Sequence, residues 1–414
     1  MEYFEEPRFH RSDFTLSQPI RLLQIVDSLH AGGMENIVVE VCNRLDPARF
    51  TVTVCCLDRL GPFAERLRPE VRRVELRKAP GFGWRYAAAL RRVMREGAFD
   101  VVHTHHLGGL IYAALARLGL GGPRVVHSEH IILHGSEVKW RRLWQRKLLY
   151  RFAASCVFAV SKQQVDQLRT LGLTHRKMFT LPNGVNCARF RPVVAEEKAA
   201  LRKRLGLSPD GFWLGKVARF ATAKRHLDLI TAFEKAVVSQ PRLRLLLVGD
   251  GGSEKQVVLD RVESSPARAH IFCAGFQQDP APWYQAMDAL VVASSYEGLP
   301  NAVLEGMASG LPVLANAACG VRELARDGEH GWIGDLSTVD QLAAGLAQAA
   351  AESPERLASM GAAAAEHVRS GFSLEAMLEK YDHLYTAVAG GNMMDLEIAA
   401  DGTFSACQPK PEMR

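Results

Sequence analysis

The stretch MDALVVASSYEGLPNAVLEGMASGLPVLANA, residues 287–317, places two apolar segments on either side of a helical one. ALVVAS (289–294) predicts a buried strand, and Pro300 suits the first turn of a helix, where its missing N–H costs nothing. That helix is expected from Pro300 to Ser309, with Gly310 ending it before the strand in LPVLANA (311–317). Strand, helix and strand in this order are typical of a parallel sheet.

The same alternation runs through both halves of the chain. Apolar runs with helical patterns between them lie at 21–26, 50–57, 99–106, 124–130 and 156–161, and again at 212–220, 243–250, 270–276, 287–294 and 311–317. Continuous apolar strands separated by helices indicate parallel sheets covered on both faces. We therefore predict an α/β fold of two Rossmann-like, doubly wound parallel-sheet domains facing a cleft.

The expected domain bounds are 1–188 for the N-terminal domain and 189–390 for the C-terminal domain, with the linker at 186–199. The last helix, at about 373–388, is expected to pack back on the N-terminal domain. Residues 391–414 show no strong periodicity and are expected to form a loose tail.

Composition limits the class of protein. No apolar run reaches the ~18 residues of a membrane-spanning helix, and the polar start of the chain does not resemble a signal peptide. The eight cysteines are scattered, which favours free thiols in a reducing cytoplasm. Residues 1–190 carry 29 Lys/Arg against 17 Asp/Glu, a net +12, whereas the remainder carries 22 against 28, a net −6. This asymmetry indicates domains with different partners.

Loops at the carboxyl ends of the strands are the expected ligand sites. Glu297 lies in such a turn, and Glu305 lies about two helical turns further on. Both carboxylates can accept hydrogen bonds from sugar or ribose hydroxyls. The backbone N–H groups from Gly298 to Asn301 form the positive end of the helix.

Two cations follow another strand of the second half. Arg219 and Lys224 in VARFATAKRH supply a guanidinium and an ammonium, which suit a diphosphate. Gly32 and Gly33 follow the first strand, where glycines let a ligand approach the backbone. Taken one by one, each feature also fits ordinary surface residues.

In this order the motifs resemble the retaining GT-B glycosyltransferases of family 4. The matching segments are GGME, HSEH and LPNGVNCARFRP in the first half, and ARFATAK, LLLVGDG, AGF and SSYEGLPNAVLEGMASGLPVLA in the second. The resemblance covers about residues 20 to 388. Two residues depart from the family pattern: Ala218 stands where glycine is common, and Met34 stands where alanine is common. These departures bear only on how closely the backbone can pack there.

The resemblance implies a role for each motif. Arg219 and Lys224 would neutralise the donor diphosphate. Glu297, with the backbone of Gly298, Leu299, Pro300 and Asn301, would hold the transferred sugar, and Glu305 would hold the ribose. Gly32 and Gly33 would admit phosphate or sugar, and His130 would face the donor sugar, so the catalytic candidates are His130, Glu297, Arg219 and Lys224. Neither a metal nor a cofactor is implied.

The histidine-rich segments HTHH (103–106) and HSEH (127–130) could also suggest a metal site. Zinc needs three or four convergent ligands, and no aspartate completes an obvious set. The resemblance implies that His130 contacts substrate, with structural packing as the alternative, and His103, His105 and His106 are expected to be structural or to face an acceptor.

The segment VKWRRLWQRKLLYRF (138–152) predicts a basic helix with tryptophans. Arg141, Arg142, Arg146, Lys147 and Arg151 would supply charge, and Trp140 and Trp144 would supply apolar area. Such a helix can lie in an anionic membrane interface, or it can pack its aromatics inward. On the membrane interpretation, Trp140, Arg141, Arg142 and Trp144 mark the acceptor or membrane side.

The resemblance favours a glycosyltransferase acting on a nucleotide-diphosphate sugar, UDP before GDP, and on a saccharide or lipid-linked acceptor for cell-surface polysaccharide. The protein would be cytoplasmic, with a peripheral position on the inner face of the plasma membrane if α-helical residues 138–152 dock there, and would not bind nucleic acid. The alternatives are another two-Rossmann sugar-nucleotide enzyme, such as an epimerase or an NAD enzyme, and a catalytically silent binding protein. HAGGME and VGDGGSE do not match the dinucleotide motif, and the four charged motif residues that a silent relative would lose are present.

Overall fold

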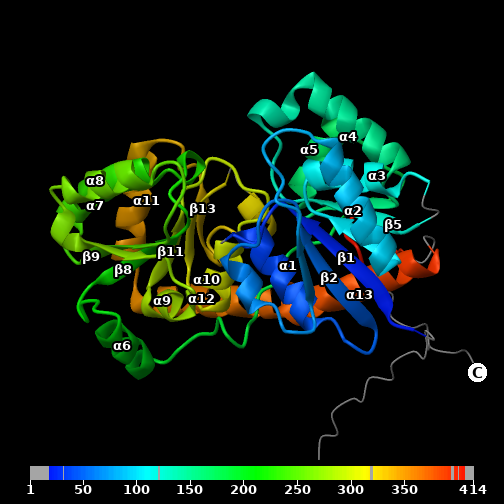
Figure 1. The fold of residues 1–414 in the computed structure, drawn as a ribbon. Helices are drawn as coiled ribbons and strands as arrows, with labels where there is room; N and C mark the ends of the chain where they lie inside the picture. The colour runs from blue at the N-terminus through cyan, green and yellow to red at the C-terminus, as the bar shows by residue number, and fades with distance from the viewer. Residues whose placement is uncertain are drawn as a thin grey trace, which may run out of the picture. The chain divides into compact units, whose positions relative to one another are not determined.

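The computed structural model describes residues 18–30, 32–119, 122–317, 320–392, 396–399 and 401–405 (Figure 1). The N-terminal segment that was compared with a signal peptide lies outside these ranges, as do Cys319, Cys407 and parts of the expected tail. Among the described residues, no helix is long and apolar enough to cross a membrane.

The first sheet has seven strands in the order β3-β2-β1-β4-β5-β6-β7. They are β1 (Ile20–Val26), β2 (Phe50–Cys56), β3 (Arg72–Glu75), β4 (Val101–Thr104), β5 (Arg124–Glu129), β6 (Cys156–Ala159) and β7 (Met178–Thr180). The helices along this part of the chain are α1 (Gly33–Arg44), α2 (Trp84–Gly97), α3 (Leu107–Arg117), α4 (Trp140–Phe152) and α5 (Lys162–Thr170). The pairing is parallel, with Leu22 opposite Val52 on one side of β1 and opposite Val101 on the other.

The second sheet has six strands in the order β10-β9-β8-β11-β12-β13. They are β8 (Phe212–Val217), β9 (Leu243–Val248), β10 (Ile271–Gly275), β11 (Ala289–Val292), β12 (Val313–Asn316) and β13 (Gly331–Gly334). The helices are α6 (Ala195–Arg204), α7 (His226–Ser239), α8 (Lys255–Glu263), α9 (Ala281–Ala286), α10 (Asn301–Ala308), α11 (Val339–Ala351), α12 (Pro354–Gly371) and α13 (Leu374–Gly390). Two parallel sheets with connecting helices confirm the predicted fold class.

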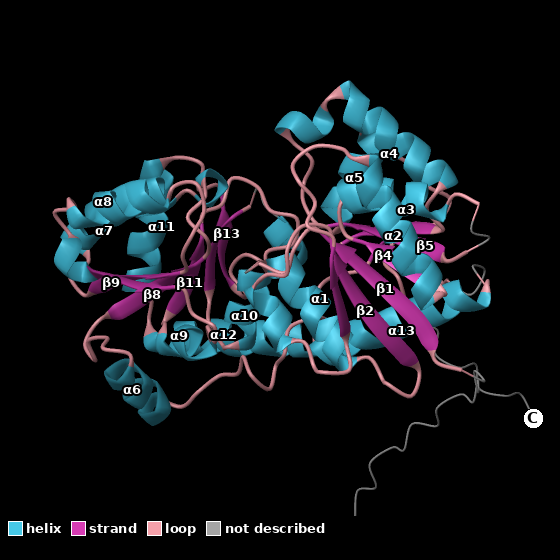
Figure 2. Cartoon of the chain, viewed as in Figure 1, coloured by secondary structure: helices cyan, strands magenta, loops and turns pink. Residues whose placement is uncertain are grey.

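Two hydrophobic cores lie on opposite faces of the second sheet. Alternate residues of each strand enter different cores: Leu245 and Val291 pack with α7, α8 and α11, whereas Leu246 and Val292 pack with α9, α10 and α12. Because side chains alternate along a strand, a sheet covered on both faces needs the continuous apolar runs seen in the sequence. Figure 2 shows the two helical layers on either side of this sheet.

The chain divides into two compact units. Among the described residues, those up to 127, 152–156 and those from 380 onward group in the first, and those within 128–151 and 157–379 group in the second. In the first unit, the end of α13 joins the strands through Arg49, whose Nη1 lies 2.5 Å from Asp382 Oδ1, and through a 2.8 Å hydrogen bond between His103 Nδ1 and the Tyr385 hydroxyl.

The described parts of the tail are folded, contrary to the expectation of a loose segment. Ile398 and Phe404 form an antiparallel bridge, and Phe404 is buried with its ring centroid 5.8 Å from that of His383. Phe404 anchors this part of the tail because burying its ring removes apolar area from water. One aromatic residue in a polar segment has no periodicity, so pattern analysis missed it.

Six of the eight cysteines lie in the described ranges, and all six are free thiols, at positions 42, 55, 56, 156, 187 and 273. Burial raises the pKa of Cys156 to about 12, and burial with the neighbouring Cys56 raises the pKa of Cys55 to about 12. These thiols stay protonated near neutral pH and behave as small core side chains.

Candidate donor-binding site

The second sheet reverses its strand order between β8 and β11, which pair directly. In open α/β sheets, ligands bind outside the carboxyl ends of strands at such a reversal. Arg219 lies two residues after β8, and Glu297 lies five residues after β11. The topology therefore brings the two predicted motifs to one edge of the second unit.

Lys224 and Glu297 form an ion pair between the two loops. Ser294 donates a 2.8 Å hydrogen bond from Oγ to the same carboxylate oxygen, and the Ser295 N–H donates to the Ala223 carbonyl at 2.8 Å. One side-chain pair and one backbone hydrogen bond thus connect the two loops directly. Both side chains of the ion pair are partly buried, at 27% and 16% exposed for Lys224 and Glu297.

Arg219 is exposed on the neighbouring segment. Within the described part of the chain, its guanidinium makes no ion pair or hydrogen bond, so its charge is available to an anion. The following loop approaches this segment closely, because a Cβ on Gly249 would lie 2.1 Å from the Ala218 carbonyl oxygen. The close contact depends on Gly249, which has φ +142°, and Ala218 fits without a glycine of its own.

Glu305 lies in α10 and accepts a 2.8 Å hydrogen bond from the Tyr284 hydroxyl of α9. Tyr284 is fully buried, and burial beside this carboxylate raises the pKa of the phenol well above its usual value. The hydroxyl therefore stays protonated and orients one oxygen of Glu305. Sequence reasoning missed Tyr284, because α9 gave no motif of its own.

Gly298 is packed where no other residue would fit. A Cβ there would lie 2.4 Å from the His130 carbonyl oxygen and 2.5 Å from Gln164 Nε2. On another side, Gly320 approaches the Gly298 carbonyl so closely that its own Cβ would lie 2.3 Å away. The segment that carries His130 therefore lies directly against residues 297–301, which we call the donor loop.

The other residues of the donor loop are fixed by burial, by the start of α10 and by a hydrogen bond. Leu299 is buried, Pro300 precedes α10 as its N-cap, and Asn301 Oδ1 accepts a 2.7 Å hydrogen bond from Asn183. Asn183 belongs to the LPNGVNCARFRP segment of the first half. Its hydrogen bond fixes the first residue of α10, and thus the direction of the helix N-terminus.

The segment carrying His130 has its own supports. His130 Nε2 lies 2.8 Å from the Ser128 hydroxyl, and the rings of His134 and Tyr296 lie 4.1 Å apart. Glu129 is buried and accepts hydrogen bonds from Arg146 Nε at 2.8 Å and from the Tyr150 hydroxyl at 2.6 Å. These two residues of α4 fix the end of β5 immediately before His130.

The residue Arg146 corrects one expectation, because it is buried rather than part of the charged surface of α4. Its guanidinium is 2% exposed and pairs with Glu129 and with Glu137 at 2.6 Å. The tryptophans do not pack inward: Trp140 and Trp144 are 71% and 59% exposed, and Arg141 and Arg142 are exposed beside them.

Gly32 and Gly33 lie in the first unit, where Gly32 precedes α1 and accepts a 3.0 Å hydrogen bond from the Asn36 N–H. A Cβ on Gly32 would lie 2.2 Å from the Glu35 carboxylate. His103 and His105 are buried in the same unit, and His105 Nε2 lies 2.7 Å from Gln24 Oε1. In the described ranges, no cluster of three or more His, Cys, Asp or Glu side chains is arranged to hold a metal ion.

Two family profiles match consecutive parts of the chain. "Glycosyltransferase Family 4" matches residues 31–189, and "Glycosyl transferases group 1" matches residues 197–367. A D-inositol 3-phosphate glycosyltransferase from Thermobispora bispora is 30% identical over 84% of this chain and 88% of its own. The chain belongs to the GT-B glycosyltransferases of family 4. It is a glycosyltransferase.

Two further relatives have a lipid acceptor in their names. The UDP-Gal:α-D-GlcNAc-diphosphoundecaprenol α-1,3-galactosyltransferase of Escherichia coli is 23% identical over 85% of this chain and 93% of its own. A GDP-mannose-dependent monoacylated α-(1-6)-phosphatidylinositol monomannoside mannosyltransferase of Corynebacterium glutamicum is 28% identical over 72% of this chain and 79% of its own. The crystal structure of Anabaena HepE with UDP and glucose aligns with a TM-score of 0.79 at 20% identity, over 89% of this chain and all of that chain.

Proposed function

We propose that this glycosyltransferase retains the anomeric configuration of the sugar and transfers it to a lipid-linked or saccharide acceptor in cell-surface polysaccharide synthesis. The observation that carries the proposal is the cluster at one sheet edge: exposed Arg219, the Lys224–Glu297 pair and the Tyr284-oriented Glu305. Two cations and two carboxylates at this spacing suit a nucleoside diphosphate joined to a sugar.

Each residue has a separate task in the proposed reaction. The bond between the sugar C1 and the β-phosphate oxygen breaks, and the diphosphate leaves with the electron pair. Arg219 and Lys224 stabilise the charge that grows on the leaving diphosphate. The acceptor oxygen bonds to C1, and its proton passes to the departing phosphate.

The carboxylates bind hydroxyls of the donor. Glu297 releases Lys224 to the diphosphate and accepts hydrogen bonds from the transferred sugar, together with the backbone of Gly298 to Asn301. Glu305 accepts hydrogen bonds from the ribose. His130 contacts the sugar, and Gly32 and Gly33 of the N-terminal domain admit the phosphate or sugar. We place the domain bounds at 1–188 and 189–390.

UDP is the proposed nucleotide. The Escherichia coli relative names UDP-galactose and the Anabaena structure contains UDP, whereas the Corynebacterium relative names GDP-mannose. Separate titrations with UDP and GDP distinguish the two, because the base is the only part of these ligands that differs.

We also propose that α4 docks on an anionic membrane surface at the cytoplasmic face. Trp140 and Trp144 are exposed and flanked by exposed Arg141 and Arg142, and the region 1–190 carries a net charge of +12. Exposed tryptophans with cations suit the headgroup region, and lipid-linked acceptors named for relatives lie in membranes. Vesicle sedimentation tests this part independently.

The experiment that tests the transferase proposal is an assay of sugar transfer from UDP- and GDP-sugars to a lipid diphosphate saccharide, followed by NMR of the product anomer. Retention with one donor supports the proposal. An inverted product would contradict the retaining mechanism, and interconversion of the nucleotide sugar without transfer would favour the epimerase-like alternative.

A further inference from the structure

Arg225 has a backbone conformation that side chains rarely adopt. Its φ is +53° and its ψ is +46°, in the left-handed region, at the junction of the 3-10 turn Thr222–Lys224 and α7. Glycine is the usual residue in this region because a Cβ crowds the backbone there. A non-glycine residue persists at such a position when its surroundings hold it there, and these positions often lie at functional sites.

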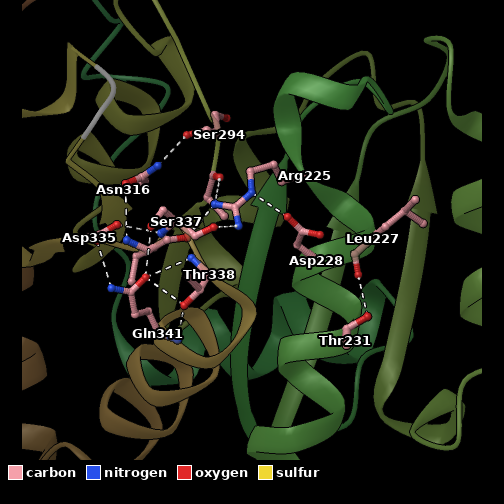
Figure 3. Close-up of polar contacts among 12 residues, drawn as sticks. Arg225, Leu227, Asp228, Thr231, Ser294, Asn316, Asp335, Ser337, Thr338 and Gln341 are labelled. Carbon is pink, nitrogen blue, oxygen red and sulfur yellow. Dashed lines mark hydrogen bonds and ion pairs between the residues drawn. The ribbon is translucent and has the colours of Figure 1, made fainter.

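The guanidinium of Arg225 connects three separate segments (Figure 3). Nε donates to Asp228 of α7 at 2.7 Å, and Nη1 donates to the Ala293 carbonyl after β11 at 3.3 Å. Nη1 and Nη2 also donate to the Leu336 and Ser337 carbonyls after β13, at 2.6 and 2.7 Å. A rigid planar fork with five donors can bridge acceptors in this way, whereas an ammonium on a flexible stem cannot.

Two of these segments carry the ion pair of the donor site. Lys224 immediately precedes Arg225, and Ala293 immediately precedes Ser294, whose hydroxyl donates to Glu297. The guanidinium therefore joins the two loops. Arg225 is adjacent to Lys224 in one loop, and its acceptor Ala293 is adjacent to Ser294 in the other. Asn316 links the segment after β11 to the segment after β13, because its Nδ2 donates to the Ser294 carbonyl at 3.1 Å and its Oδ1 accepts from the Leu336 N–H at 3.4 Å.

The third segment, residues 336–337 after β13, leads directly into a capped helix start. Thr338 and Gln341 form a capping box at the start of α11, and Gln341 also donates to Asp335 at 3.0 Å (Figure 3). Reciprocal capping holds the first turn of a helix in place. The carbonyls of Leu336 and Ser337 are therefore presented from a structured helix start rather than from a free loop.

We propose that Arg225 is a positioning residue for sugar transfer, which sets the separation of Lys224 and Glu297. This inference rests on the proposed function of those two residues. The hydrogen bonds of the Arg225 guanidinium go to protein acceptors, so the role we assign to it is positioning and not contact with substrate. Its loss lets the loops separate, and small displacements of groups that stabilise a transition state reduce turnover strongly.

The decisive variant is Arg225→Gly, because glycine adopts the left-handed conformation freely and only the guanidinium is lost. We expect kcat to fall about 10- to 100-fold, while the KM for the nucleotide sugar changes less than about threefold. Arg225→Lys keeps the charge without the fork, so its kcat should lie between those of Arg225→Gly and the wild type.

The matched control is Arg261→Ala, which removes a two-pronged arginine pair to Glu234 in the same unit, away from both loops. It should lower the melting temperature and leave kcat unchanged. Wild-type kcat in Arg225→Gly would overturn the inference, and should that variant fail to fold, wild-type kcat in Arg225→Lys would do so. Sugar transfer by the wild type is scored separately, since its absence contradicts the proposed function instead.

A crystal structure of Arg225→Gly provides a readout that does not depend on activity. The inference predicts a broken or lengthened contact between Lys224 Nζ and Glu297. An unchanged ion pair, with the Ser294 hydrogen bond retained, would show that Asn316 and the backbone hold the loops without Arg225.

Discussion

Single side chains at the donor site carry the proposed chemistry, and Arg219 and Lys224 provide the sharpest test. Replacing either with alanine removes a charge that would stabilise the leaving diphosphate, so kcat should fall by about 100- to 1000-fold. Lys255→Ala is the matched control, because Lys255 pairs with Asp250 on a neighbouring loop and is 47% exposed. Wild-type turnover in either test variant would remove that residue from the site.

Gly298 tests the close approach of the His130 segment. An alanine methyl group at this position would meet the His130 carbonyl at 2.4 Å, so Gly298→Ala must displace the donor loop or destabilise the fold. We expect the KM for the nucleotide sugar to rise at least tenfold, or the melting temperature to fall by several degrees. Gly334→Ala is the control, since nothing lies within 4 Å of its Cβ position, and equal kinetics and stability in both variants would contradict the packing.

At the scale of elements, α4 has a buried side and an exposed side. Its buried Arg146 and Tyr150 hold Glu129, while its other face exposes Trp140 and Trp144. Replacing both tryptophans with serine should release the protein from vesicles of anionic lipid, and 0.5 M salt should weaken binding by the wild type. Val238→Ser is the control, because Val238 is equally exposed on α7, and unchanged sedimentation of the double variant would remove the membrane proposal.

The sequence predicted elements whose pattern is strong and missed those whose pattern is weak. Strands β3, β7 and β13 were not predicted, because β3 is a polar edge strand, RRVE, and β7 and β13 are the short segments MFT and GWIG. Short or half-exposed strands lack a continuous apolar run. The helix of the 287–317 segment was expected at 300–309 and lies at Asn301–Ala308.

The candidate site was predicted where a motif lies at a strand end, and its supports were not. Arg219, Lys224, Glu297 and Glu305 follow their strands as expected. Tyr284, Gln164 and Arg225 act through contacts between segments distant in sequence, which no local pattern encodes. Arg146 shows the opposite error, since a basic residue on a basic helix is expected at the surface.

For the whole molecule, buried histidine makes stability depend on pH. Burial, with Lys216 and Lys224 nearby, lowers the pKa of His226 to about 2, and the pKa values of His330 and His367 are also lowered, mainly by burial. Below about pH 6.5 the unfolded chain takes up protons at these positions more readily than the native protein does. Unfolding is therefore favoured as pH falls, and stability is greatest above that value.

The pH prediction can be assigned to one residue. Between pH 6.5 and pH 5, His226→Leu should lose less stability than the wild type, by up to about 1.4 kcal/mol per pH unit, in urea unfolding. His270→Leu is the control, because His270 is only partly buried. Parallel pH profiles for His226→Leu and the wild type would show that His226 is protonated in the native state.

The most direct test of the central claim is a thermal-shift titration of the wild type, Arg219→Ala and Lys224→Ala with UDP, GDP, ADP and NAD, with and without EDTA. A ligand at 100 times its Kd stabilises the native state by about 2.7 kcal/mol, which is several degrees of melting temperature. The account predicts a shift with UDP in the wild type that is insensitive to EDTA and much smaller in both variants. A shift of equal size in the variants, or with NAD alone, would contradict it.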